Sequence, residues 1–271
     1  MVKLGHFHLG ITKVEVRLDF FYLLWYLFII VIYAVASDIH GNLEALFSFF
    51  AYLDEFNPDR CVILGDTVGY GPQPNECIEE IRKRDILACA GNHDLAAIGE
   101  NDARKFNPFA RRAIEWTKKV LSEENKFWLS AIPRIIREND LIFVHGSLRN
   151  WTSEYIFDEE QAKESFFLLK EKVLFVGHTH CPCLFIKEWD RIIRMNIPEG
   201  AGITLPFPAI INPGSIGQPR DRNPNPSFGL FDTEKSKFKL FRFSYEIKKT
   251  QSLMREKRLP EYLAERLSKG K

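Results

Sequence analysis

The sequence has almost no net charge and few cysteines. Its 37 lysines and arginines balance 36 aspartates and glutamates, so the composition gives no sign of a broad nucleic-acid surface or a polybasic membrane patch. The five cysteines are odd in number, and their spacing follows neither a disulfide framework nor a zinc pattern. We therefore expect reduced thiols in a cytoplasmic protein without specific nucleic-acid binding.

The sequence also lacks internal repeats, low-complexity segments and a full-length membrane span. Sixteen glycines and 14 prolines in 271 residues exclude a fibrous chain, and 45% hydrophobic residues suffice for a sizeable core. Residues 20–36 carry no charge, but 17 residues are at the short limit for a bilayer crossing. Because 32–36 read as a strand, we do not expect this run to span a membrane. Membrane anchoring through 20–36 is the alternative.

From residue 31 onward, short apolar runs alternate with helical patterns, which indicates an α/β domain. We expect one domain over 31–271 with C-terminal helices, preceded by an extension of uncertain role over 1–30. The charged segment 244–271 is interpreted as a solvated amphipathic helix pair divided by Pro260. The other predicted helices cover 42–56, 74–84, most of 95–131, and 159–169. The predicted strands cover 32–36, 61–64, 86–90, 134–137, 141–144, 173–176, 184–186, 191–195, 209–211, 228–231 and 238–243.

Five predicted strands are each followed by a short cluster of metal-binding residue types. Ligands of open α/β sheets bind beyond the carboxyl ends of strands, so we expect the five clusters to converge on one site there. In an extended segment, residues i and i+2 point to the same side, so each paired cluster presents two ligands together. Carboxylate oxygens and imidazole nitrogens suit manganese, iron or zinc. The clusters are Asp38-Ile39-His40, Gly65-Asp66, Gly91-Asn92-His93-Asp94, His145-Gly146 and Gly177-His178-Thr179-His180.

This ordered set resembles the calcineurin-like metallophosphoesterase superfamily, whose pattern is Asp-x-His, Gly-Asp, Gly-Asn-His-Asp/Glu, His and Gly-His-x-His. The resemblance covers about residues 31 to 245. Three stretches resemble the small prokaryotic, phosphodiesterase-type branch of the superfamily: 37–42, 65–72 and 212–221. The resemblance implies a four-layer αββα sandwich of two mixed β-sheets, with the active site at the C-terminal ends of the strands.

The resemblance also implies two divalent metal ions per chain, with manganese favoured and iron, nickel or zinc as alternatives. Two ions about 4 Å apart share a water and bring its pKa toward neutrality, and the bridging hydroxide then attacks phosphorus. His93 would protonate the leaving group or, alternatively, donate an orienting hydrogen bond to phosphate, and Asp94 would orient His93. One ion would be held by Asp38, His40, Asp66 and His180, and the other by Asp66, Asn92, His145 and His178.

We therefore expect a phosphoesterase that hydrolyses phosphodiesters or small-molecule phosphoesters. Protein phosphatases of the superfamily carry an Asp-Arg pair shortly after Gly-Asp, whereas residues 67–71 here contain no arginine. The alternatives are a dinucleoside polyphosphate hydrolase, a protein phosphatase and, less favoured, a non-catalytic scaffold. The candidate substrate contacts are Asn42, Tyr70 and Arg220. Tyr70 would stack on a base or pack the loop, and Arg220 would bind a distal phosphate or pair with Asp221. The oligomeric state is not predicted.

Overall fold

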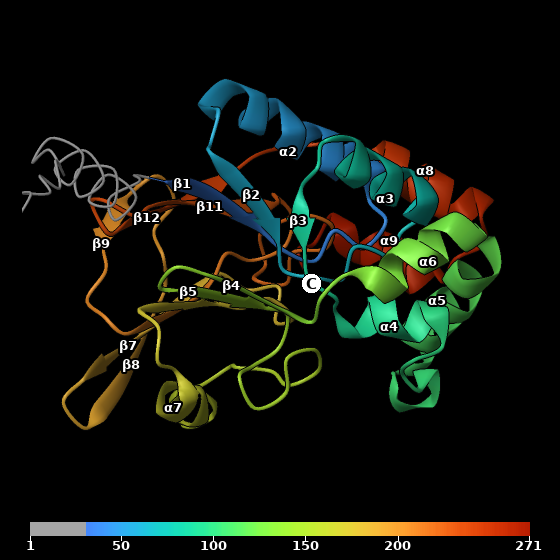
Figure 1. Ribbon diagram of the computed structural model, residues 1–271. Helices are drawn as coiled ribbons and strands as arrows, with labels where there is room; N and C mark the ends of the chain where they lie inside the picture. The colour runs from blue at the N-terminus through green and yellow to red at the C-terminus, as the bar shows by residue number, and fades with distance from the viewer. Residues whose placement is uncertain (1–30) are drawn as a thin grey trace, which may run out of the picture.

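Two six-stranded mixed sheets face each other across a shared apolar core in the computed structural model, which describes residues 31–271 (Figure 1). The predicted extension over 1–30 lies outside the described residues. The first sheet has the spatial order β3 (Leu87–Ala88), β2 (Arg60–Ile63), β1 (Ile32–Ala36), β11 (Ser227–Asp232), β12 (Lys237–Arg242) and β9 (Gly202–Thr204). The second has the order β4 (Ile135–Glu138), β5 (Leu141–Val144), β6 (Val173–Phe175), β10 (Ala209–Asn212), β7 (Cys183–Glu188) and β8 (Arg191–Met195).

Helices cover the outer faces of both sheets, which confirms the four-layer αββα sandwich. Figure 1 shows α2 (Leu43–Phe56) and α3 (Pro74–Lys83) over the first sheet and α7 (Glu159–Leu168) beside the second. The remaining helices gather at one end of the molecule. They are α4 (Asn92–Ile98), η1 (Ala103–Lys105), α5 (Pro108–Val120), α6 (Glu123–Ala131), α8 (Ile247–Glu256) and α9 (Glu261–Leu267).

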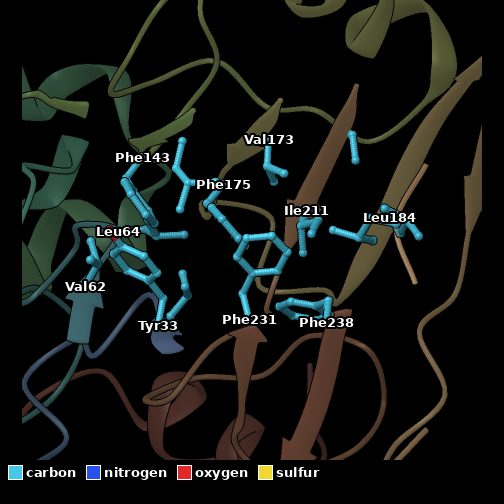
Figure 2. Packing of buried hydrophobic residues seen from close by; sticks show 14 of the residues in the cluster. Tyr33, Val62, Leu64, Phe143, Val173, Phe175, Leu184, Ile211, Phe231 and Phe238 are labelled. Atoms are coloured by element: carbon cyan, nitrogen blue, oxygen red, sulfur yellow. The ribbon is translucent and has the colours of Figure 1, made fainter. Parts of the chain in front are cut away.

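The alternation of large and small side chains along β1 sets the packing of the first sheet. Tyr33 and Val35 point toward the second sheet, whereas Ala34 and Ala36 lie against α2. Between the sheets, the rings of Phe143 and Phe175 stack with centroids 5.1 Å apart, and Figure 2 shows Tyr33 among them. Small residues on the helix side let α2 approach closely, and aromatic residues fill the space between the sheets.

Two sequence expectations differ from the structure. The strand expected over 86–90 is only Leu87–Ala88, because the amide of Ala90 leaves the sheet and donates to the carbonyl of Pro133 at 2.8 Å. The strand β9 was not predicted, since three partly exposed residues carry no alternating pattern.

The C-terminal helices α8 and α9 pack against the loops that contain Asn42 and Tyr70. They are therefore less exposed than the solvated helix pair expected from the sequence. Thr250 and Met254 of α8 are buried, and the Thr250 hydroxyl donates to Asn42 Oδ1 at 3.0 Å. Leu263 and Leu267 of α9 pack in one apolar cluster with Tyr70. The charged residues therefore form only the outer face of this pair.

Among the helices of residues 31–271, none combines the length and apolar composition needed to cross a bilayer. Within the apolar run 20–36, Ile32–Ala36 form strand β1, as expected. Residues 20–30 of that run lie outside the described residues.

Candidate metal centre and active site

The five predicted clusters lie together beyond the carboxyl ends of β1, β2, β3, β5 and β6. Each of their seven candidate ligands is at most 9% exposed. Asp38, His40 and His180 bring their ligand atoms within 4.8 Å of one another, and so do Asp66, His145 and His178. A further such group joins His40 and Asp66 to His93, so the two sets are contiguous.

Five of the seven candidate ligands have a left-handed backbone conformation. Their φ values are 56° for Asp38, 51° for His40, 51° for Asp66, 65° for His178 and 59° for His180. The expectation that an extended segment pairs Asp38 with His40 was therefore wrong, because tight turns bring these residues together. A non-glycine residue in this conformation costs about 1–3 kcal/mol and persists where the surroundings enforce it, commonly at functional sites.

Backbone carbonyls orient the four imidazole rings. In three rings Nδ1 faces a carbonyl oxygen, which leaves Nε2 directed into the site. His178 is reversed, since its Nε2 faces the Ser153 carbonyl at 3.1 Å and its Nδ1 faces the site. Donation of one ring N–H to a carbonyl is the usual arrangement of a metal-binding histidine. The other three pairs are His40 with Val68 at 3.2 Å, His145 with Leu64 at 2.7 Å, and His180 with Gln218 at 2.6 Å.

The inward-facing nitrogens form two close pairs. His40 Nε2 lies 3.2 Å from His180 Nε2, and His145 Nε2 lies 2.9 Å from His178 Nδ1. Two ligand atoms on one ion with bonds of about 2.0–2.1 Å lie roughly 3.0–3.4 Å apart, so both pairs are compatible with a shared cation.

The oxygen ligands complete a donor set that fits divalent cations. Asp38 Oδ1 lies 3.1 Å from His180 Nε2, and Asp66 Oδ2 lies 3.3 Å from His145 Nε2 and 3.7 Å from His40 Nε2. Asp38 Oδ1 and Asn92 Oδ1 are buried without a hydrogen-bond partner within residues 31–271. Buried acceptors without donors are costly unless a cation compensates them. The residues present therefore fit divalent cations.

Burial and mutual charge set the protonation of these groups. Burial lowers the pKa of His178 to about 3 and that of His180 to about 4, which leaves both rings in the neutral form that binds metals. Burial opposes charge on Asp38 as well, but His180 and His145 hold the pKa of this carboxyl well below its usual range. Burial also disfavours charge on His145, yet Asp66 and Asp38 raise its pKa to about 9. Metal binding would therefore displace a proton from His145.

Glycines let the loops of the site approach each other. A Cβ at Gly91 would collide with Oδ1 of Asp66, and a Cβ at Gly177 would collide with the hydroxyl of Ser37. Asp66 Oδ1 accepts the backbone N–H of His93 at 2.8 Å, so this oxygen anchors the loop and Oδ2 remains in the site.

His93 lies at the border of the two candidate ligand sets. Its ring centroid is 4.8 Å from that of His40, 4.5 Å from Tyr70 and 4.8 Å from Phe106. Nδ1 of His93 is buried without a hydrogen-bond partner in the described part of the chain. Burial lowers the pKa of His93 well below its usual range, so the ring is neutral.

Asp94 does not orient the His93 ring, which corrects the role implied by the resemblance. Its carboxylate accepts the backbone N–H groups of Val68 at 3.0 Å and Gly91 at 2.9 Å. Burial raises the pKa of Asp94, and the charge of Asp66 adds to this, while the two amides oppose it. Asp94 thus joins the loop after β2 to the start of α4.

Of the three candidate substrate contacts, two are committed to the fold. Asn42 caps α2 through Ala45, donates to the Gly217 carbonyl at 2.9 Å and accepts from Thr250. Tyr70 is 6% exposed and packs 4.6 Å from the ring of His40, which matches the loop-packing interpretation and not base stacking.

Arg220 lies beside the site but does not pair with Asp221. Its backbone N–H donates to the His180 carbonyl at 3.2 Å, and its Nη2 donates to Gln218 Oε1 at 3.0 Å. Asp221 pairs with Arg242 instead. The surface ion-pair alternative was therefore wrong, because the buried guanidinium of Arg242 takes this carboxylate.

Sequence reasoning did not find Tyr155. Its ring stacks on the His178 ring with centroids 3.7 Å apart and an interplanar angle of 11°. Phe157 stacks on Tyr155 in turn, at 5.0 Å. The only sequence signal is a loop rich in aromatic residues shortly after His145, and that pattern does not specify a partner.

Comparisons with known proteins agree with this geometry. The profile of the calcineurin-like phosphoesterase superfamily domain matches residues 32–236. An uncharacterized protein of Methanocaldococcus jannaschii is 37% identical over 248 residues, which are 88% of this chain and 98% of that protein. The crystal structure of a metallophosphoesterase from Sphaerobacter thermophilus is similar with a TM-score of 0.80 and 36% identity, covering 90% of this chain and all of that one. A hypothetical protein from Pyrococcus horikoshii shares the fold with a TM-score of 0.75 and 21% identity, over 89% of this chain and 99% of that one.

Proposed function

Because this chain belongs to the calcineurin-like phosphoesterase superfamily, we propose that it hydrolyses phosphodiesters or small-molecule phosphoesters with two divalent metal ions. The observation that carries the proposal is the pair of ligand sets that share Asp66. Its Oδ1 is occupied by the amide of His93, while Oδ2 faces both His40 and His145. Asp66 would therefore be the ligand common to both ions.

The proposed ligand sets combine carboxylate, amide and imidazole donors without a thiolate. This donor set suits manganese, and iron, nickel or zinc are the alternatives. When bound, the ions would supply an activated water and neutralise charge on the phosphoryl oxygens. The first ion would take Asp38, His40, Asp66 and His180, and the second Asp66, Asn92, His145 and His178.

Two side chains of the protein would act on the ester. Asn92 would position the phosphate, and His93 would donate a proton to the leaving group. The amide NH₂ of Asn92 would donate to an oxygen of the phosphate while its Oδ1 binds metal. His93 is neutral in the free site, and an arriving phosphate would raise its pKa toward the range in which it donates a proton. If His93 instead keeps its proton, it acts as an orienting donor to phosphate.

A dinucleoside polyphosphate hydrolase is the second candidate function. Arg220 lies next to His180, where it would meet a more distant phosphate, and the absence of arginine from residues 67–71 disfavours a protein phosphatase. A non-catalytic scaffold is disfavoured, since all seven candidate ligands are present and turned into one site. The proposal includes a small-molecule substrate and a cytoplasmic location, in keeping with the balanced charge and the free thiols.

A substrate panel with defined metal content tests the proposal. The protein is stripped with a chelator and reloaded with manganese, iron, nickel or zinc. It is then assayed on an aryl phosphomonoester, an aryl phosphodiester, cyclic nucleotides and a dinucleoside polyphosphate. We expect manganese-dependent hydrolysis of at least one ester, with the phosphodiester preferred over the monoester. Two bound ions with no hydrolysis of any ester, together with stoichiometric binding of a protein partner, would establish the scaffold instead.

A further inference from the structure

Three aromatic rings form a stack that runs from the candidate metal centre to the surface. The Tyr155 ring lies 3.7 Å from that of the candidate ligand His178, and the Phe157 ring lies 5.0 Å from that of Tyr155 at an interplanar angle of 17°. The exposed fraction rises along the stack, from 4% at His178 to 38% at Tyr155 and 49% at Phe157. The stack therefore connects a candidate metal ligand with the solvent.

The chain around Ile156 holds the two outer rings away from the core. It belongs to the loop between β5 and α7 (Figure 1). Ile156 is buried in the apolar cluster of the second sheet, and its neighbours Tyr155 and Phe157 therefore point the other way, where they stack on each other. The backbone N–H of Phe157 donates to Oε1 of Gln161 in α7 at 2.6 Å, which fixes this residue at the start of the helix.

Contacts within the same loop keep its shape without a ligand. The backbone N–H of Gly146 donates to the carbonyl of Trp151 at 2.7 Å, and a Cβ at Gly146 would collide with the carbonyl oxygen of Asn150. The carbonyl of Ser153 faces Nε2 of His178 at 3.1 Å, so the loop is tied to the metal centre as well. The two outer rings are thus in place before a ligand arrives, which reduces the entropy lost on binding.

Burial in the core does not account for the two outer rings. Neither Tyr155 nor Phe157 belongs to one of the buried apolar clusters within residues 31–271. Their rings lie instead beside a candidate metal ligand, where the organic part of a bound phosphoester would also lie. Aromatic side chains stack on flat rings, and every nucleobase offers such a ring.

We propose that Tyr155 and Phe157 form a subsite for a planar ring of the substrate, and that this ring is the base of a nucleotide. In a nucleotide one sugar separates the phosphate from the base, so a phosphate bound at the metal centre would bring the base within reach of the stack. Tyr70 is not available for this role, because it is buried against His40. The substrate class rests on the proposed function, whereas the stacking of a base can be measured without hydrolysis.

Calorimetric titration of the manganese-loaded protein with two phosphonates tests the subsite without turnover. In a phosphonate, carbon replaces the ester oxygen, so the 5′-phosphonate of thymidine is not hydrolysed. The same sugar phosphonate without its base is the reference ligand. We expect the base to strengthen binding about fivefold or more, in line with the stacking of one base on an aromatic side chain. Equal affinity for the two phosphonates, or no binding of either, would overturn the subsite.

Variants of Phe157 change the stack without touching a candidate ligand. Phe157→Leu keeps an apolar side chain and removes the ring, so we expect it to lose most of the gain from the base while its affinity for the base-free phosphonate stays unchanged. Phe157→Trp keeps an aromatic ring and should preserve the gain. Phe167→Leu, at a phenylalanine of α7 that is 85% exposed, is the matched control and should behave like the unmodified protein. An undiminished gain in Phe157→Leu would show that the stack only supports His178, and would reject the subsite.

A pair of diesters with the same leaving group tests the substrate class. Methyl p-nitrophenyl phosphate and the p-nitrophenyl ester of thymidine 5′-phosphate both release p-nitrophenolate. We expect a lower KM for the thymidine ester, and we expect Phe157→Leu to remove most of this difference while Phe167→Leu preserves it. Hydrolysis of both esters with equal KM would reject the nucleotide substrate and leave the phosphoesterase proposal intact. Base-dependent binding of the phosphonate without hydrolysis of any ester would reject the phosphoesterase proposal and leave the subsite intact.

Discussion

His40 and His180, 140 residues apart in the chain, place their Nε2 atoms 3.2 Å from each other. Two further loops hold the rings in this arrangement. Nδ1 of His40 faces the carbonyl of Val68, and Nδ1 of His180 faces the carbonyl of Gln218. Two inward lone pairs at this distance repel unless a proton or cation lies between them. Metal binding at this centre would therefore depend on the arrangement of loops from both sheets.

Metal loading should stabilise the protein against unfolding. The ligand set is assembled in the folded chain only, so ions bind the native state in preference to the unfolded one. A single site at one hundred times its dissociation constant contributes about 2.7 kcal/mol. Thermal denaturation of chelator-treated protein with and without added manganese measures the effect. Calcium, which prefers all-oxygen sites, is the control and should raise the melting temperature less.

Replacing Asp66 with asparagine should weaken both metal sites together. The change removes the charge of the shared oxygen Oδ2, which faces His40 on one side and His145 on the other. We expect at least a tenfold loss of affinity for each ion, measured by elemental analysis after equilibrium dialysis. Asp190→Asn, in the exposed turn between β7 and β8, is the control and should bind metal normally. Two fully occupied ions in Asp66→Asn would contradict the bridging assignment.

His93→Ala should keep its metals and lose most of its turnover. His93 is not required by either four-ligand set, and general acid catalysis typically contributes about 10²–10⁴-fold. A series of esters with increasingly basic leaving groups separates the two roles of this residue. An acid role makes the loss grow as the leaving group becomes more basic, whereas an orienting role makes it uniform across the series. A rate near that of the unmodified protein on a poor leaving group would exclude the acid role.

Tyr155→Ala should weaken the metal site that contains His178 and spare the other one. The Tyr155 ring stacks on His178 at 3.7 Å, and the stacking of two rings contributes about 0.5–1.5 kcal/mol. We expect up to about tenfold weaker binding at this one site, measured as a two-phase cobalt titration by absorbance. Tyr155→Phe keeps the stacked ring and should restore the titration. Trp189→Ala, at a side chain that is 95% exposed, is the control. Equal loss at both sites in Tyr155→Ala would contradict this positioning role.

Gly91→Ala should destabilise the fold and reduce metal affinity. The new methyl group would collide with Oδ1 of Asp66, and overpacking of this kind typically costs about 1–3 kcal/mol. Gly200→Ala provides a comparison, because no atom lies within 4 Å of a Cβ at that position, where φ is 75°. Urea denaturation should show the larger loss for Gly91→Ala, and only Gly91→Ala should bind manganese more weakly. Equal stability of the two variants would show that the loop of Asp66 can move aside.

Much of the fold and the identity of the candidate ligands could be predicted from local sequence. The short apolar run 32–36 predicts a strand, and β1 covers those residues in the structure. Metal-binding residue types follow five apolar runs, and this order predicts a site beyond the carboxyl ends of the strands. Periodicity and the chemistry of side chains depend on neighbouring residues alone, so they can be read without knowing the packing.

The sequence by itself determined which donors the site contains and where along the chain they occur. Only the tertiary structure decided how they face one another. The left-handed turns at Asp38 and His40, the reversed ring of His178 and the stacking of Tyr155 all depend on contacts with other segments. The placement of α9 beside Tyr70 likewise follows from packing of side chains nearly 200 residues apart in the sequence. Such contacts leave no local pattern, because their energy arises only when both segments are folded together.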